Sequence, residues 1–242
     1  MAHHIPTWSH KSFSQHEPSA IQFGVASTLA ADLMPRAEKD LASADDKAPD
    51  PTARLGWIPA LINAFVTLII SIKFVYLYPF NYSLDYYIDI YDPLAVFAVY
   101  FFIAYMILDL ILGSIFYPKH MDWLSGYVHH ILYIGIFGLW LYNNMAIAAC
   151  LTFFEEIPTL ILSIGKINHK YRSDAIFGLS FFLIRIVYHG YLVGVILVAE
   201  TLQPVLLYPS LLAMSMHIYW FYTWLIKYGL PMINPNYKKS KK

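Results

Sequence analysis

The chain has 242 residues, of which 58% are hydrophobic and only 13% are charged. This composition lies outside the range of soluble globular domains and is typical of a membrane protein with several spans. The 16 basic and 16 acidic residues give a formal net charge of zero, which offers no reason to expect nucleic-acid binding. A single cysteine, Cys150, excludes an intrachain disulfide.

The two ends of the chain differ in composition from its centre. Residues 1–56 are rich in Ser, Ala, Asp and Pro with mixed charges and no sustained apolar face, which predicts a largely disordered cytosolic tail. Residues 229–242 end in a cluster of lysines and predict a short basic cytosolic tail. The central segment, residues 57–228, is expected to form the transmembrane domain.

Six segments of the centre are long and apolar enough to cross a bilayer, which takes about 20 residues of helix. They are Trp57–Leu77, Leu94–Tyr117, Trp123–Leu141, Met145–Ile164, Ala175–Ala199 and Val205–Ile226. Because lipid offers no partners to backbone N–H and C=O groups, each segment is expected to be helical. The sequence therefore predicts an all-α, polytopic membrane helix bundle with six transmembrane helices.

Basic residues gather in alternate connecting segments, as the positive-inside rule requires of cytosolic loops. Lys or Arg is present before the first span, between the second and third, between the fourth and fifth, and after the sixth. Residues 78–93, 142–144 and 200–204 carry neither. This alternation predicts six crossings with both termini in the cytosol.

Ionisable side chains interrupt the apolar segments, although burying such a group in hydrocarbon costs several kcal/mol unless it finds a partner. These residues are Asp109, His129, His130, Glu155, Glu156, Arg185, His189 and His217. They fall at similar depths in five of the predicted helices, which indicates a polar interior. Function is expected there, and structural contacts between helices are the alternative role for each of these groups.

Spacing indicates which of these groups share a helix face. Arg185 and His189 are four residues apart and therefore lie on one side of their helix. Arg185 is expected to pair with Glu155, Glu156 or Asp109. Because three carboxyl groups face one arginine, at least one must be protonated, pair with a charged histidine or bind a cation. The sequence leaves these alternatives open.

The order of these motifs resembles the TLC domain, a family of ceramide synthases and smaller membrane proteins that lie mostly in the endoplasmic reticulum. The residues that carry the resemblance are Asp109, His129-His130, Glu156-Ile157-Pro158, Arg185 and, more weakly, His217. The resemblance implies a helical barrel around a polar, lipid-sized cavity that opens toward the cytosol. It also implies localisation in the endoplasmic reticulum and membrane lipids as partners.

In ceramide synthases the histidine pair transfers an acyl group from acyl-CoA to a sphingoid amine. By resemblance, the catalytic candidates are His129, His130, Glu156 and Asp109. Imidazole suits acyl transfer because it is nucleophilic when neutral. A lipid-binding or structural polar network is assigned to Arg185, Glu155, His189, His217, Tyr133 and Trp220. Acyl-CoA is the expected co-substrate, and no resident cofactor or metal is assigned.

Two departures place the chain nearer to the smaller TLC proteins than to the synthases. Tyr133 stands where the synthases have threonine in H-H-x-x-T, and their extended acidic segment after the glutamate is missing. We therefore expect a protein of lipid homeostasis that binds or modifies a lipid or acyl chain, with acyl transfer as the candidate reaction. A non-enzymatic lipid regulator and a metal-dependent lipid hydrolase are the alternatives. Whether His129 or His130 faces the cavity is left open, because adjacent residues point about 100° apart.

Overall fold

The computed structural model describes residues 54–77, 90–199, 203–234 and 237, all within the unit Pro49–Lys242. The tail expected over residues 1–56 lies outside the described residues up to position 53, as do the lysines at 238–242. The C-terminal segment expected as a tail from residue 229 begins with a short helix, α12 (Leu230–Ile233).

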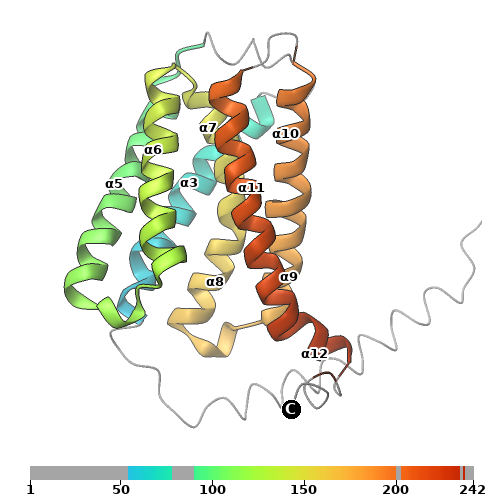
Figure 1. Ribbon diagram of the computed structural model, residues 1–242. Helices are drawn as coiled ribbons and strands as arrows, with labels where there is room; N and C mark the ends of the chain where they lie inside the picture. The colour runs from blue at the N-terminus through green and yellow to red at the C-terminus, as the bar shows by residue number, and fades with distance from the viewer. Residues whose placement is uncertain (1–53, 78–89, 200–202, 235–236, 238–242) are drawn as a thin grey trace, which may run out of the picture. The chain divides into compact units, whose positions relative to one another are not determined.

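The described residues form helices and contain no strand, which confirms the all-α prediction (Figure 1). The first two long helices are α3 (Trp57–Leu77) and α5 (Pro93–Phe116). The third joins a π-helical turn, η2 (Trp123–Val128), to α6 (His129–Tyr142). The fourth consists of α7 (Ala146–Thr152), the 3₁₀ turn η3 (Phe153–Glu156) and α8 (Ile157–Ile167). The fifth consists of α9 (Asp174–Phe181), the π-helical turn η5 (Phe182–Tyr188) and α10 (His189–Leu197), and the sixth is α11 (Pro204–Trp224).

Five of these helices are long and apolar enough to cross a membrane, so the protein is an integral, multi-pass membrane protein. They are Trp57–Leu77, Pro93–Phe116, Trp123–Tyr142, Ala146–Ile167 and Asp174–Leu197, and each agrees with a predicted span to within a few residues. The sixth helix, α11, has 21 residues but is less apolar, because prolines, serines and His217 interrupt it. That α11 crosses the membrane, and that both termini lie in the cytosol, stay predictions.

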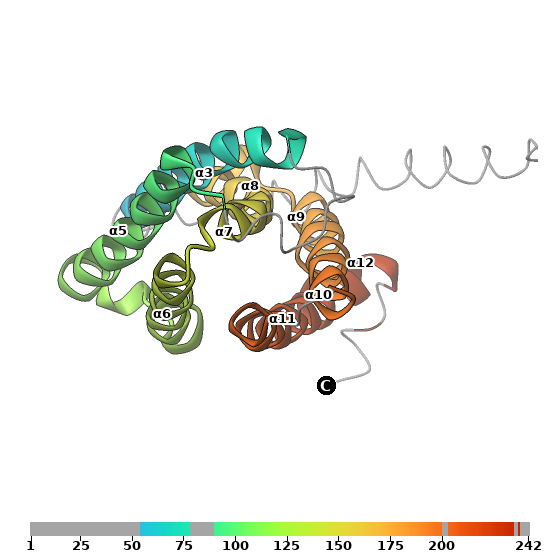
Figure 2. The same ribbon diagram turned by 90° about the horizontal axis from the view of Figure 1, so that it is seen from above.

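The helices of this unit pack as a series of neighbours that returns on itself (Figure 2). Helix α6 packs against α5, α5 against α3, α3 against α8, and α8 against α9. Helix α10, which continues α9 through η5, packs against α11, and α11 contacts α6. Helix α7 and the turn η3 pack against both α3 and neighbouring helices, which makes the fourth helix the most buried of the five candidate spans.

A proline in α11 accounts for one of the contacts between α6 and α11. Pro209 has no N–H to donate to the carbonyl of Val205, four residues earlier, and lipid offers no substitute. The indole Nε1 of Trp140 on α6 donates a hydrogen bond of 2.9 Å to that carbonyl instead. The side chain of Trp140 is thereby fixed at the joint between the two helices.

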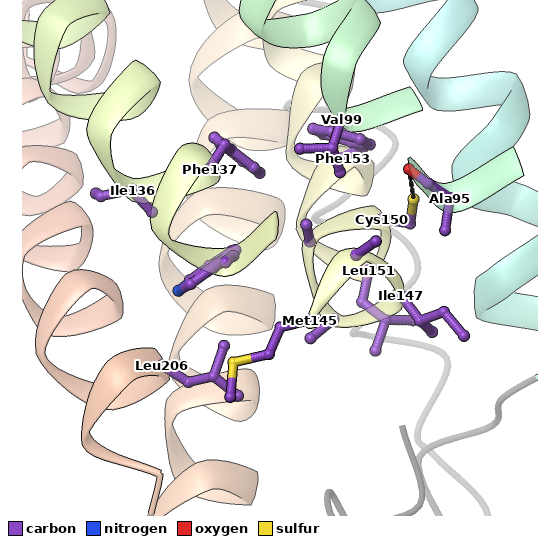
Figure 3. Close-up of a cluster of buried hydrophobic side chains, with 14 of the residues drawn as sticks. Ala95, Val99, Ile136, Phe137, Met145, Ile147, Cys150, Leu151, Phe153 and Leu206 are labelled. Atoms are coloured by element: carbon purple, nitrogen blue, oxygen red, sulfur yellow. Dashed lines mark hydrogen bonds between the residues drawn. The ribbon is translucent and has the colours of Figure 1, made fainter. Parts of the chain in front are cut away.

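An apolar core packs around the fourth helix (Figure 3). The rings of Phe102 and Phe137 lie 5.0 Å and 5.3 Å from the ring of Phe153, measured between centroids. The thiol of Cys150 points to the carbonyl of Ala95 at 3.8 Å, a weak contact in a fully buried position. Because Phe153 opens the turn η3, this packing positions Glu155 and Glu156.

Candidate functional site

Breaks in the regular helices carry several of the predicted site residues. The π-helical turn η2 ends immediately before His129 and His130, and η5 contains Arg185. The 3₁₀ turn η3 presents Glu155 and Glu156, directly before Pro158 in the first turn of α8. Such turns alter the direction of side chains relative to a continuous α-helix and are frequent at functional sites.

His130 has a defined partner on each side of its ring. Its Nδ1 donates to the backbone carbonyl of Gly126, and its Nε2 lies 3.0 Å from Oδ2 of Asp109, an ion-pair distance outside hydrogen-bond alignment. The hydroxyl of Tyr117 donates to the other carboxylate oxygen, Oδ1, at 2.9 Å. Both His130 and Asp109 are buried. This histidine is therefore held in place by its surroundings.

Nδ1 of His129, like Nε2 of His130, is buried without a hydrogen-bond partner among the described residues, but only the His130 atom has a carboxylate within ion-pair distance. Aromatic rings surround His129: the centroid of Tyr133 lies 4.2 Å away and that of Trp220 lies 5.3 Å away. An unpaired ring nitrogen costs stability in an apolar setting. Of the two adjacent histidines, His129 therefore keeps a ring nitrogen available for another molecule.

Glu155 and His189 form a second buried pair. The Nδ1 atom of His189 lies 2.7 Å from Oε1 of Glu155, and its Nε2 lies 2.9 Å from the carbonyl of Ser210. Since a carbonyl only accepts, Nε2 carries a hydrogen and donates it. The glutamate and the histidine consequently share the proton between Oε1 and Nδ1.

Arg185 links the fourth, fifth and sixth helices. Its Nε donates to the backbone carbonyl of Glu155 at 3.1 Å, and one terminal nitrogen contacts Oγ1 of Thr159 at 2.9 Å and Oε1 of Glu156 at 3.4 Å. The other terminal nitrogen lies 3.3 Å from Nε2 of His217. Arg185 therefore pairs with the Glu156 carboxylate, one of the three predicted alternatives.

The hydrogen bonds of His217 define its tautomer. Its Nδ1 donates to the carbonyl of Arg185 at 3.2 Å, so its Nε2 is the accepting nitrogen. Nε2 receives the N–H of Arg185 and the hydroxyl of Tyr133, which lies 3.2 Å away. His217 is fully buried and is neutral in this arrangement.

The three carboxyl groups of the interior each have a basic partner. Asp109 lies against His130, Glu155 against His189, and Glu156 against Arg185. The pairing accounts for the excess of carboxyl groups over arginine without requiring an added cation. Because separated buried charges are costly, each pair is expected to behave as a unit.

A cavity of about 30 Å³ lies between these groups and the aromatic core. Its ionic side is formed by Glu155, Glu156, Arg185 and His189, and its aromatic side by Phe102, Tyr133, Phe137, Trp140 and Phe153. This volume has room for one or two water molecules. Pockets for drug-sized ligands measure roughly 300–1,000 Å³, so this cavity is too small for a lipid.

Glu155, His189 and His217 each offer one ligand atom, and these atoms lie within 4.8 Å of one another. Two histidines and a carboxylate are a ligand set typical of zinc. Here Nδ1 of His189 is at hydrogen-bond distance from Glu155, and the guanidinium of Arg185 lies 3.3 Å from His217. A divalent cation would meet this fixed positive charge, so the geometry favours a charge-paired network over a metal centre.

The structure brings the predicted site residues together in two connected groups. Asp109, His129 and His130 form one, and the groups around Arg185 form the other. Tyr133 contacts both groups, through the ring of His129 and the ring nitrogen of His217. Trp220 also lies against the rings of His129 and His217. Neither His129 nor His130 is among the described residues that line the cavity.

Sequence reasoning missed Tyr117, which holds the Asp109 carboxylate. Its position, eight residues after Asp109 and therefore about two helical turns along one face, is the signal that was available. It also left Thr159 outside the site, although this residue lies four positions after Glu155.

Comparisons with protein-family models, with curated proteins and with solved structures find no match for this chain.

Proposed function

We propose that this protein is a TLC-type membrane protein of lipid homeostasis that binds an acyl chain between its helices and transfers it through His129. The observation that carries the proposal is the buried, unpartnered Nδ1 of His129, next to a His130 whose ring is held by Asp109 and Gly126. A pair in which one histidine is fixed and the other is free is suited to chemistry at the free ring.

The proposed reaction uses acyl-CoA as the donor. A neutral imidazole nitrogen of His129 attacks the thioester carbonyl carbon, a C–N bond forms and the C–S bond breaks. The CoA thiolate leaves and takes up the imidazole proton. An amine or hydroxyl of a lipid then attacks the acyl-imidazole, which restores the ring and gives the proton of the nucleophile back to it.

The surrounding groups have supporting roles in this proposal. The Asp109–His130 pair positions the helix turn that carries His129, because its contacts link α5 to α6. The guanidinium of Arg185 lies across from Tyr133 and lines the cavity, where it would hold a carbonyl or headgroup oxygen. Glu156 keeps that guanidinium in place at 3.4 Å.

A second candidate function, lipid binding without turnover, is favoured by a separate observation. The ionic groups of the interior are paired with one another, and the cavity measures about 30 Å³. A paired interior of this kind stabilises a bundle that recognises lipids at its surface or in an opened form. Localisation in the endoplasmic reticulum and cytosolic termini belong to both proposals.

The test is intact-mass spectrometry of the purified protein after incubation with hexadecanoyl-CoA, with the extracted lipids analysed in parallel. We expect an acyl adduct, or a new acylated lipid, that is lost in His129→Ala. The matched variant His130→Ala removes the neighbouring ring, and we expect it to lower thermal stability as well as adduct formation.

The outcomes separate the two functions. An adduct on His129 supports acyl transfer. A lipid that copurifies unchanged with both the wild type and His129→Ala, without any adduct, contradicts acyl transfer and supports binding alone. Arg185→Gln then serves as the discriminating variant, because loss of the copurified lipid in it would locate binding at the charged cavity.

A further inference from the structure

The side chain of Tyr133 contacts both the cavity and His129. Its ring lines the cavity and also contacts the ring of His129, with centroids 4.2 Å apart. Its hydroxyl reaches across to α11 and lies 3.2 Å from Nε2 of His217. An acyl chain that extends from the cavity past Tyr133 to His129 has to displace this ring.

From these contacts we infer that Tyr133 is the specificity-determining residue of the site: the space that its ring leaves when it turns sets how long an acyl chain the cavity admits. The inference rests on the proposed function and adds to it the residue that selects the substrate by chain length. With the ring in place the cavity measures about 30 Å³, room for water and not for a chain.

The other large rings of α6 that line the cavity are held more firmly. Trp140 is buried and donates its indole N–H to Val205 at 2.9 Å. Phe137 is buried between Phe102 and Phe153, with ring centroids 4.7 Å and 5.3 Å away. Tyr133, by contrast, is only partly buried. It is therefore the ring on α6 that can turn at the least loss of packing.

Release of Tyr133 also leaves no polar atom of the network without a partner. When its hydroxyl departs, Nε2 of His217 keeps the N–H of Arg185, which lies 3.3 Å away. The hydroxyl itself would find the carbonyl or headgroup oxygen of the entering lipid. Because buried groups that lose every partner carry the largest cost, this exchange makes movement of Tyr133 feasible.

The test uses the full chain in lipid nanodiscs and photoactivatable fatty acids with octanoyl, dodecanoyl and hexadecanoyl chains. Labelled peptides are identified by mass spectrometry, and the ratio of hexadecanoyl to octanoyl labelling on peptides of α6 is compared between variants. Tyr133→Ala removes the ring, Tyr133→Phe removes only the hydroxyl, and Tyr133→Leu keeps apolar packing for the case in which alanine does not fold. Tyr188→Ala is the control, since it deletes the same atoms outside the cavity lining.

We expect the hexadecanoyl ratio to rise several-fold in Tyr133→Ala and Tyr133→Leu and to stay at the wild-type value in Tyr133→Phe and Tyr188→Ala. A wild-type ratio in both truncated variants would overturn the inference, and so would an equal rise in Tyr133→Phe. Failure of the proposed function is recognised separately, because it shows as the absence of a His129-dependent adduct whatever the labelling ratio.

Discussion

The Nε2 atom of His130 lies 3.0 Å from Oδ2 of Asp109, whereas the adjacent His129 has no carboxylate within ion-pair distance among the described residues. Two neighbours in the sequence thus differ in role because the helix turns by about 100° per residue. One histidine joins α6 to α5 and the other faces the rings of Tyr133 and Trp220.

The first prediction concerns the Asp109–His130 pair. We expect Asp109→Asn to lower the free energy of unfolding by about 3 kcal/mol, because removal of one partner leaves a buried base without its countercharge. Thermal unfolding in detergent, followed by helix circular dichroism, measures the loss. Tyr117→Phe is the matched control: it deletes one hydrogen bond to the same carboxylate and should cost only about 1 kcal/mol. Equal losses would contradict the ion-pair assignment.

The second prediction concerns the shape of the Arg185 side chain. Arg185→Lys keeps the positive charge but cannot contact Glu155, Thr159 and His217 at the same time, because an ammonium lacks the planar fork. We expect a loss of about 3 kcal/mol from the several charged hydrogen bonds. Thr159→Ala deletes one of them and should cost about 1 kcal/mol in the same thermal assay. Wild-type stability in the lysine variant would show that charge alone is sufficient.

The spans could be predicted because a crossing requires a local run of apolar residues. Trp57–Leu77 was predicted and found with the same bounds, and other spans differ by a few residues. The turn η3 lies directly before Pro158, which has no N–H to donate to the carbonyl of the turn before it. The π-helical turns η2 and η5 were not predicted, since no residue type marks them.

The partners of the polar residues could be predicted only as a set. Arg185 had three carboxyl candidates, and the choice depends on helix rotations that the sequence does not encode locally. The structure gives it the carboxylate of Glu156 and only the backbone carbonyl of Glu155. The Glu155 carboxylate pairs instead with His189, whose Nδ1 lies 2.7 Å from Oε1.

The third prediction concerns close packing between α9 and α11. A Cβ atom added at Gly178 would lie 1.8 Å from Cζ2 of Trp224, whose indole donates to the carbonyl of Asp174 at 3.1 Å. We expect Gly178→Ala to cost about 2 kcal/mol by overpacking. Gly135→Ala, where nothing lies within 4 Å, should stay within about 0.5 kcal/mol of the wild type. Tryptophan fluorescence should shift only in the first variant, and an unshifted spectrum would contradict the packing.

The fourth prediction concerns pH and the residue that caps α5. Burial tends to raise the pKa of Asp92, but the hydrogen bond from Lys73 and those from the N–H groups of Ala95 and Leu94 outweigh it and hold the pKa below its ordinary value. A lowered folded-state pKa stabilises the fold above the unfolded-state value of about 3.9 and loses this effect as the pH falls through the folded-state pKa.

Asp92→Asn keeps a capping oxygen and removes only the charge. We expect it to be less stable than the wild type by about 0.5 kcal/mol at neutral pH, where the pair with Lys73 is exposed in part. The difference should shrink below about pH 4 as the wild-type carboxylate protonates. Thermal unfolding over this pH range measures it. A difference that persists at the acid end would assign the effect to capping geometry and not to charge.

The fifth prediction concerns the sixth helix, whose apolar character is the weakest. We expect α11 to cross the membrane, because its least lipid-compatible group, His217, is fully buried and hydrogen-bonded to Arg185 and Tyr133. A polar residue satisfied inside a bundle does not face lipid and so does not prevent a span. Epitope tags at the two ends should then be equally sensitive to protease in sealed microsomes. A digested N-terminal tag with a protected C-terminal tag would show an odd number of crossings and would place α11 outside the spanning set.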